Sequence, residues 1–163
     1  MVERPPERGD RVQIYPFAVV TVRREVGAAV DAVWAVLADG WRYTSWMVGA
    51  SRMREVDPAW PGMGAQLHYS VGTWPLLLDD TATVLACVPK RELVVRSRAW
   101  PVGQTEIKLT LDERGAGCEV VLSEQVRGGP GRVLPPPARS ALLGPRNAET
   151  LRRLAYLAEG ELR

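Results

Sequence analysis

The chain has 163 residues, of which 46% are hydrophobic and 25% charged, a composition typical of one folded domain and unlike that of a disordered segment. Its 21 basic and 19 acidic residues leave a formal net charge of +2. Dedicated nucleic-acid binders concentrate an excess of positive charge, so we expect no nucleic-acid partner. No apolar run approaches the roughly 20 residues of a membrane-spanning helix, so we also expect no membrane insertion.

The N-terminal segment is polar and contains Pro5, Pro6 and Gly9. It lacks the apolar stretch of a signal peptide. We therefore expect residues 1–15 to form a flexible arm and residues 16–163 to form a single domain. Without an export signal the default compartment is the cytoplasm, where Cys87 and Cys118 would remain free thiols.

The first part of the domain begins with a strand pattern and then changes to a helical pattern. Residues 17–26 are rich in Val and Thr, which predicts a strand. Residues 28–38 change to a helical period, with Val30, Val33, Trp34 and Leu37 on one face. Gly40 ends this helix, and a second short helix is expected over residues 41–47.

The middle of the chain predicts an antiparallel meander. Short turns rich in Gly or Pro separate the expected strands, which cover residues 51–56, 65–71, 76–88, 92–100, 105–113 and 118–126. In the strand 65–71 the apolar positions Leu67, Tyr69 and Val71 share one face, and His68 lies on the other. In the last strand Glu124 shares a face with Val120 and Leu122.

The C-terminal part contains the only long helical pattern in the second half of the chain. Leu151, Leu154, Ala155 and Ala158 recur at helical spacing within residues 138–162, which predicts an amphipathic helix. Residues 138–143 form either a separate turn or the start of the same helix, kinked at Pro145. Residues 128–137 are expected to be a linker. An amphipathic helix that follows a meander packs on the sheet, so the fold class is α+β.

These elements, in this order, resemble the helix-grip fold of the SRPBCC superfamily, which includes START lipid-transfer domains, the birch pollen allergen and polyketide cyclase/dehydrase-like proteins. The resemblance covers residues 17–162 and is carried by Val33-Trp34, the segment 41–46, the turn 61–64, and Asn147 with Leu151 and Leu154. It implies a seven-stranded curved antiparallel sheet around a long C-terminal helix, with two short helices after the first strand and a hydrophobic cavity between sheet and helix. It implies binding of lipids, polyketides or isoprenoid-like molecules, and it implies no particular reaction.

No complete set of catalytic side chains is visible in the sequence. His68 and Glu124 are the candidates for acid–base chemistry, although the parity of its strand places His68 on the solvated face. Glu124 is a candidate to hold a polar group of a ligand, to hold a water, or to pair with an arginine at the cavity. Asp79 and Asp80 point to opposite faces of a strand, so one of them faces inward and needs a partner. That partner is an arginine such as Arg96 or Arg98, or else a polar group of a ligand.

Aromatic side chains are the expected lining of the cavity, because flat apolar rings with one polar atom suit hydrophobic ligands. The predicted ligand-binding residues are Trp41, Trp46, Tyr69, Trp74, Trp100, Glu124 and Tyr156. One histidine and two scattered cysteines make no zinc set, so no metal and no cofactor are expected. Arg146, Arg152 and Arg153 are interpreted as the solvated face of the last helix.

The favoured function is therefore binding of a hydrophobic small molecule inside the domain. The alternative is a polyketide aromatase/cyclase-like enzyme, a cyclase or dehydratase without cofactor that uses the same cavity. A second copy of the chain is a further partner that the sequence allows.

Overall fold

The computed structural model describes residues 19–99 and 102–160, so the expectations for residues 1–15 and for Trp100 lie outside the described residues. The elements in chain order are β1 (Val19–Val26), α1 (Val30–Ala38), η1 (Gly40–Arg42), α2 (Tyr43–Trp46), β2 (Ala50–Val56), β3 (Gln66–Thr73), β4 (Leu76–Val88), β5 (Glu92–Ala99), β6 (Gly103–Arg114), β7 (Gly117–Val126), η2 (Pro130–Val133) and α3 (Pro136–Gly160).

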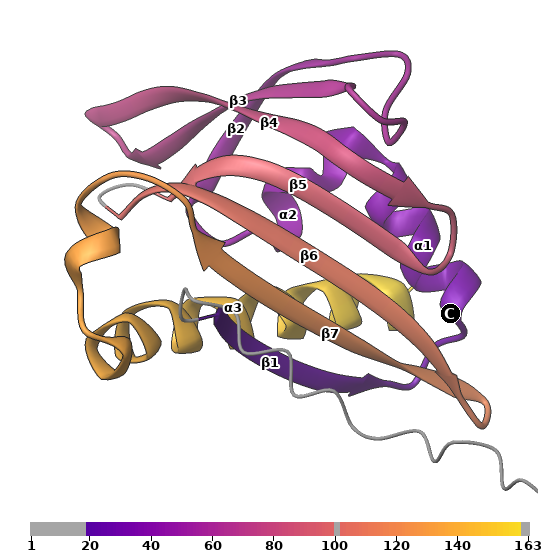
Figure 1. The fold of residues 1–163 in the computed structure, drawn as a ribbon. Coiled ribbons are helices and arrows are strands. Elements are labelled where there is room, and N and C mark those ends of the chain that lie inside the picture. The colour runs from indigo at the N-terminus through magenta and orange to yellow at the C-terminus, as the bar shows by residue number, and fades with distance from the viewer. Residues whose placement is uncertain (1–18, 100–101, 161–163) are drawn as a thin grey trace, which may run out of the picture.

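The strands form one seven-stranded sheet in the order β1-β7-β6-β5-β4-β3-β2, with every neighbouring pair antiparallel. The meander runs from β2 to β7, and β1 pairs with β7 at the far edge. Figure 1 shows the sheet curving around α3, with α1 and α2 on the same side as that helix. The predicted helix-grip architecture, with its seven strands, two short helices and long C-terminal helix, is confirmed.

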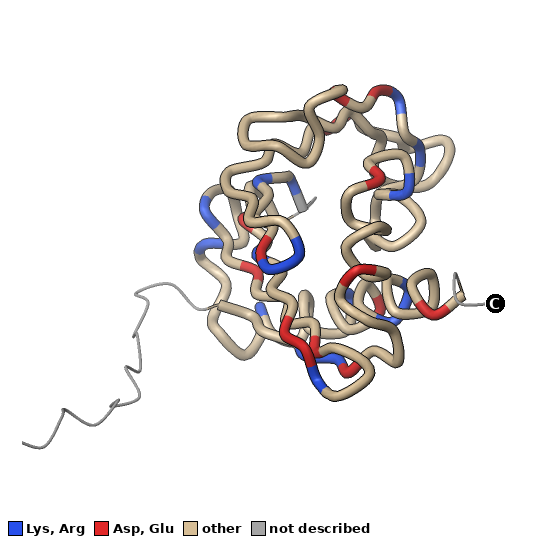
Figure 2. Tube along the Cα trace, turned by 90° about the vertical axis from the view of Figure 1, so that its right-hand side faces the viewer, with Lys and Arg blue, Asp and Glu red and all other residues tan. Residues whose placement is uncertain are grey.

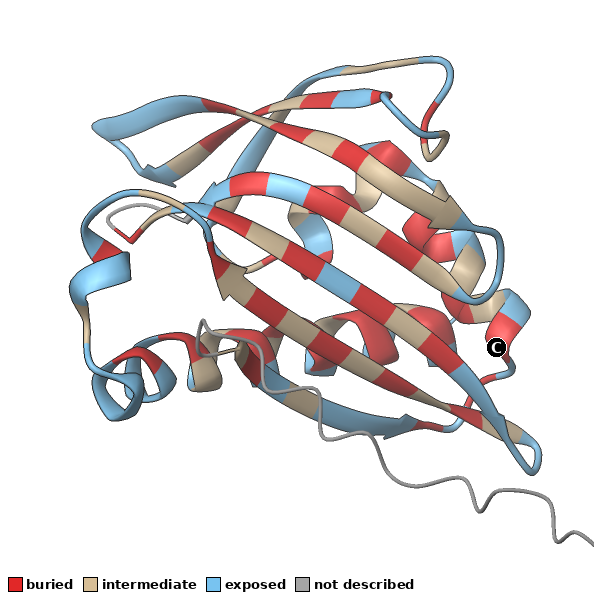
Figure 3. Ribbon diagram, viewed as in Figure 1, coloured by how far each residue is buried: buried red, intermediate tan, exposed pale blue. Residues whose placement is uncertain are grey.

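The alternating sequence of the strands decides which side chains enter the core. Along β7 burial alternates at every residue, so that the inward positions carry the apolar side chains and Glu124. The same banding runs along β6 in Figure 3. Successive strand residues point to opposite faces of the sheet, so one face covers the core and the other meets solvent.

Helix α3 runs without interruption from Pro136 to Gly160 and contains Pro145. The linker is therefore shorter than predicted: it ends at Pro135 and includes η2, and the residues from Ala138 to Leu143 belong to the long helix. Pro136 and Pro137 lie in the first helical turn, where a missing backbone N–H breaks no intrahelical hydrogen bond. None of the helices described here has both the length and the hydropathy needed to cross a membrane.

The predicted apolar face of α3 is buried at Leu151, Leu154, Ala155 and Ala158. This part of the helix packs on β1, α1 and α2. Two polar contacts fix its position: the Thr150 hydroxyl accepts from the backbone N–H of Val48 at 3.2 Å, and Glu159 Oε1 accepts from that of Gly27 at 2.8 Å. Cys87 and Cys118 are both free thiols.

Candidate functional site

A cavity of about 610 Å³ lies beside α2 and α3, against the inner face of the sheet. This volume falls within the range of pockets that hold small organic ligands. The cavity is lined by Tyr43, Met47, Val48, Gly49, Ala50, Tyr69, Val71, Gly72, Thr73, Pro75, Leu76, Leu77, Leu78, Ser97, Arg98, Ile107 and Arg146. Most of these side chains are apolar, so the cavity offers an apolar surface with a small number of polar groups.

The outer part of the cavity is formed by the hairpin of β3 and β4. Leu76 and Leu78 are cavity-lining residues that remain 80% and 47% exposed. Their register with Thr73 and Val71 places them on the same face of the sheet as the buried Asp80 and Ala82. They are exposed although they face inward, so they mark the end at which the cavity reaches solvent.

The inner part of the cavity contains a cluster of hydroxyl groups from three different elements. Tyr43 comes from α2, Tyr69 from β3 and Ser97 from β5, and all three side chains are buried. The rings of Tyr43 and Tyr69 pack at a tilt, with centroids 5.1 Å apart. The Tyr69 hydroxyl donates to Asp80 Oδ2 at 3.3 Å. The Tyr43 hydroxyl is buried and finds no hydrogen-bond partner of good geometry within residues 19–99 and 102–160.

Asp80 is the inward member of the acidic pair predicted in β4. Its carboxylate accepts from the backbone N–H of Thr81 at 2.7 Å and from that of Arg98 at 3.1 Å, in addition to the Tyr69 hydroxyl. Burial raises the pKa of this carboxyl, and these hydrogen bonds offset part of the rise. Of the two arginines predicted as partners, Arg98 contacts the Asp80 carboxylate through its backbone N–H. The other, Arg96, pairs with Glu106 at 2.9 Å.

Burial also controls the ionisation of the two tyrosines. It raises the pKa of Tyr43 to about 12, and it raises the pKa of Tyr69 further, with Tyr43 and Asp80 adding to the effect. Both phenols therefore stay protonated at neutral pH and act as hydrogen-bond donors. The hydroxyls of Tyr69 and Ser97 lie close to that of Tyr43, but no described residue accepts from it with good geometry, so an acceptor atom of a bound molecule would satisfy it better.

Glu124 is fully buried and engaged in a network that joins β7 to α3. Arg146 Nη2 donates to both of its carboxylate oxygens at 2.9 Å, and Asn147 Nδ2 donates to Oε2 at 2.7 Å. Of the partners considered for Glu124, the structure therefore provides the arginine at the cavity. Arg146 does not belong to a solvated face as predicted, because its side chain is only 22% exposed.

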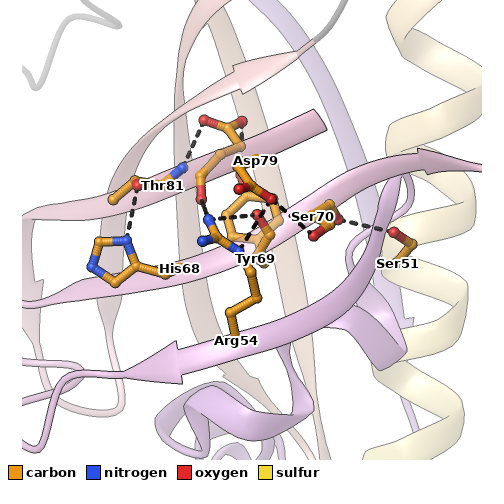
Figure 4. Close-up of polar contacts among 8 residues, drawn as sticks. Ser51, Arg54, His68, Tyr69, Ser70, Asp79 and Thr81 are labelled. Carbon is orange, nitrogen blue, oxygen red and sulfur yellow. Dashed lines mark hydrogen bonds and ion pairs between the residues drawn. The ribbon is translucent and has the colours of Figure 1, made fainter. Parts of the chain in front are cut away.

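His68 lies on the face of β3 that points away from the cavity, as its strand parity predicted. Its ring Nδ1 is 3.1 Å from the Thr81 hydroxyl on the neighbouring strand, a contact visible in Figure 4. The same view shows Arg54 holding the two strands together, with Nη2 donating to the backbone carbonyls of Tyr69 and Asp80. His68 is not among the cavity-lining residues, so this position gives it no access to a molecule bound there.

The predicted aromatic lining is distributed differently in the structure. Trp46 is buried in the core, with its ring edge-on to Tyr43 at a centroid distance of 5.1 Å. Trp41 and Trp74 are 60% and 85% exposed and do not line the cavity. Tyr156 is 74% exposed and lines a separate hollow of about 360 Å³. Tyr69 is the one member of the predicted set within residues 19–99 and 102–160 that lines the main cavity.

Charged side chains outside the cavity are largely paired along the strands and α3. Glu106 accepts from Arg96 and Arg127, and Lys108 lies 2.7 Å from Glu92. Figure 2 shows basic and acidic positions interspersed along the chain. Within the described part of the chain, no group of three or more His, Cys, Asp and Glu residues is arranged to hold a metal ion.

Comparison with known proteins agrees with this geometry. The family model described as "Polyketide cyclase / dehydrase and lipid transport" matches residues 18–159. No curated protein matches the sequence significantly. Solved structures also match this chain in fold.

Protein NE0264 from Nitrosomonas europaea has a TM-score of 0.67 at 16% identity, covering 88% of this chain and 96% of that one. The di-domain ARO/CYC StfQ from the steffimycin biosynthetic pathway has a TM-score of 0.66 at 14% identity, covering 89% of this chain and 52% of that one. Ara h 8.0201 has a TM-score of 0.64 at 10% identity, covering 86% of this chain and 97% of that one. At these identities the likeness shows a shared fold.

Proposed function

Because the chain belongs to the polyketide cyclase/dehydrase and lipid-transport family, we propose that it binds a hydrophobic small molecule, of the lipid, polyketide or isoprenoid type, in the cavity between sheet and helix. The observation that carries this proposal is the cavity of about 610 Å³ with its mostly apolar lining. Burial of about 200 Å² of apolar ligand surface contributes on the order of 5 kcal/mol to binding.

The polar groups at the inner end specify how such a molecule lies. The Tyr43 hydroxyl makes no hydrogen bond of good geometry to a described residue, and Ser97 lines the cavity beside it. The charge of Arg146 is compensated by Glu124. A ligand with a neutral acceptor oxygen at one end, such as a carbonyl, fits this environment, with its apolar part toward Leu76 and Leu78.

A dye-displacement titration tests the proposal. The wild-type protein is titrated with the fluorescent dye ANS and then with a panel of long-chain ketones, alcohols and fatty acids. In the variant Ala50→Trp an indole ring fills part of the cavity, because Ala50 lines it, whereas Val133→Trp adds the same ring at a position that is 84% exposed. We expect Ala50→Trp to lose dye binding and Val133→Trp to keep it. Equal binding by the two variants, or no displacement by any compound of the panel, would contradict the proposal.

A second candidate function is aldol cyclisation or dehydration of a polyketide in the same cavity. The observation that favours it is the pair of Tyr69 and Asp80, in which a buried carboxylate accepts from a hydroxyl at the cavity wall. In such a pair the phenolic oxygen of Tyr69 can take a proton from the carbon next to a substrate carbonyl while the Tyr69 hydroxyl proton passes to the Asp80 carboxylate. Here Tyr69 replaces His68 and Glu124 as the residue to test, because Tyr69 lines the cavity and the other two do not. Asp80 acts behind Tyr69, through the hydrogen bond that it accepts from the Tyr69 hydroxyl.

An assay with a poly-β-keto substrate separates this enzyme from a carrier. If the chain is a cyclase, Tyr69→Phe changes the product distribution and His68→Ala, which alters the outer face of β3, leaves it unchanged. If products with and without the protein are the same, the cyclase proposal fails and the carrier proposal stands on the titration.

A further inference from the structure

The hairpin that forms the mouth of the cavity also exposes an unusual amount of apolar surface. Trp74 is 85% exposed, Leu76 80%, Leu78 47% and Leu77 39%. The other exposed large apolar side chains of the described residues lie well apart in the sequence: Trp41, Met63, Val88, Val133, Leu142 and Tyr156. Val71–Leu78 contains no charged residue, so the tip of this hairpin presents an uncharged apolar surface.

The pairing of the strands explains why this surface is uncovered. The ladder between β2 and β3 ends at Ala50 and Val71, and the ladder between β4 and β5 begins only at Thr83 and Arg96. Between these limits the hairpin has no strand neighbour within residues 19–99 and 102–160. The hairpin ends lie at the left of Figure 1 and are exposed in Figure 3.

We infer that the tip of the β3–β4 hairpin docks on a lipid surface, with Trp74 and Leu76 in the interfacial layer and the mouth of the cavity facing the lipid. This inference goes beyond the proposed function and does not depend on it. The sequence-based expectation of no membrane insertion rested on the lack of a membrane-spanning segment. Contact of a hairpin with the interfacial layer requires no such segment, so that expectation does not exclude it.

A lipid surface fits this hairpin better than a protein partner does. A stable protein interface buries about 800 Å² on each side and takes about 20 to 30 residues. The uncovered tip, Val71–Leu78, is far shorter than that and carries no charge to fix the orientation of a partner. A bilayer interface requires no shape complementarity, and tryptophan prefers that layer because its ring is apolar and its N–H remains hydrated.

The position of the hairpin relative to the cavity agrees with this assignment. Leu76, Leu77 and Leu78 line the cavity and are also exposed on the hairpin, so apolar surface continues from the cavity to the docking site. A hydrophobic molecule could therefore pass between lipid and cavity without crossing water. The nearest acidic side chain along β4, Asp79, is paired with Arg54 at 3.4 Å, so its charge does not oppose the contact.

Flotation with phosphatidylcholine vesicles tests the inference. The matched variants are Trp74→Ser and Trp41→Ser, because both remove an exposed tryptophan that does not line the cavity, and only Trp74 lies on the hairpin. We expect Trp74→Ser to lower the vesicle partition coefficient about ten-fold or more, and Trp41→Ser to leave it unchanged. The melting temperatures of both variants should equal that of the wild type, because both side chains are exposed. Binding should persist at high salt, since the hairpin is uncharged.

Several results would overturn the inference. They are an absence of wild-type binding up to millimolar lipid, equal losses in the two variants, and binding that requires anionic lipid and disappears in high salt. Sedimentation that shows a wild-type dimer and a monomeric Trp74→Ser variant would assign the hairpin to a second copy of the chain. Dye titration of Trp74→Ser without vesicles measures the cavity separately. If the variant binds dye normally but no longer binds vesicles, the defect lies in the hairpin and not in the cavity.

Discussion

The network around Glu124 gives the sharpest prediction about stability. Removal of Arg146 by the substitution Arg146→Leu leaves a fully buried carboxylate whose remaining described donor is Asn147 Nδ2. The leucine cannot replace the hydrogen bonds to the two oxygens of Glu124. The free energy of unfolding should therefore fall, because an uncompensated charge in the interior is costly.

The magnitude follows from the burial of the two partners. Loss of one partner of a buried ion pair costs about 3 to 5 kcal/mol, and the lower end applies here because Asn147 remains and Arg146 is 22% exposed. A domain of this size loses about 2 to 4 °C of melting temperature per kcal/mol, so we expect a decrease of about 6 to 12 °C. That loss is a large part of the 5 to 15 kcal/mol that is usual for a whole domain.

Urea unfolding followed by circular dichroism measures the effect. Glu149→Gln is the matched control, because it breaks contacts of Glu149 with Arg152 and Arg153 on the surface of the same helix, where ion pairs contribute little. The double variant Glu124→Gln/Arg146→Leu should recover most of the loss, since it removes the stranded charge. A midpoint for Arg146→Leu equal to that of Glu149→Gln, or no recovery in the double variant, would refute the reasoning.

Two further predictions concern the cavity and the surface. Tyr43→Phe removes a buried hydroxyl that makes no hydrogen bond of good geometry to a described residue. The ligand-free protein should therefore keep its free energy of unfolding within about 1 kcal/mol, while its affinity for carbonyl-bearing ligands falls. A larger loss of stability in calorimetry would count against an unpartnered hydroxyl. Burial raises the pKa of Glu106, but hydrogen bonds and charges of Arg96 and Arg127 lower it by more, so the net pKa is below its ordinary value. The stabilisation by Glu106 is therefore present above about pH 4.3 and is lost as pH falls through the lowered value. The difference in unfolding free energy between wild type and Glu106→Gln should shrink from neutral pH to about pH 3, and a difference that grows on acidification would be inconsistent with these contacts.

The strands and the long helix could be predicted because their burial follows local periodicity. The inward face of β7 is an example, since the alternation that places Val120 and Leu122 in the core also places Glu124 there. The partner of Glu124 could not be predicted in the same way. Arg146 reaches it only because of how α3 is positioned against the strand, and this depends on packing between elements far apart in sequence.

The hydroxyl cluster was missed for the same reason. Tyr43, Tyr69 and Ser97 come from three elements, and no local pattern relates them. The aromatic lining of the cavity was also difficult to predict, because the exposure of a side chain depends on where neighbouring strands end. Trp74 follows a strand whose parity is clear, but the sequence does not reveal that the β3–β4 hairpin extends beyond its neighbouring strands and exposes this ring.

The most direct test of ligand binding in the cavity is methyl NMR on isoleucine-labelled protein. The chain has only two isoleucines, Ile14 and Ile107, so the spectrum is simple to assign, and Ile107 is buried and lines the cavity. With an unlabelled long-chain ketone added, we expect intermolecular NOEs between the ketone and the δ1 methyl group of Ile107. Saturating ketone that gives no NOE to Ile107 and leaves its methyl signal unshifted would contradict binding between the sheet and α3.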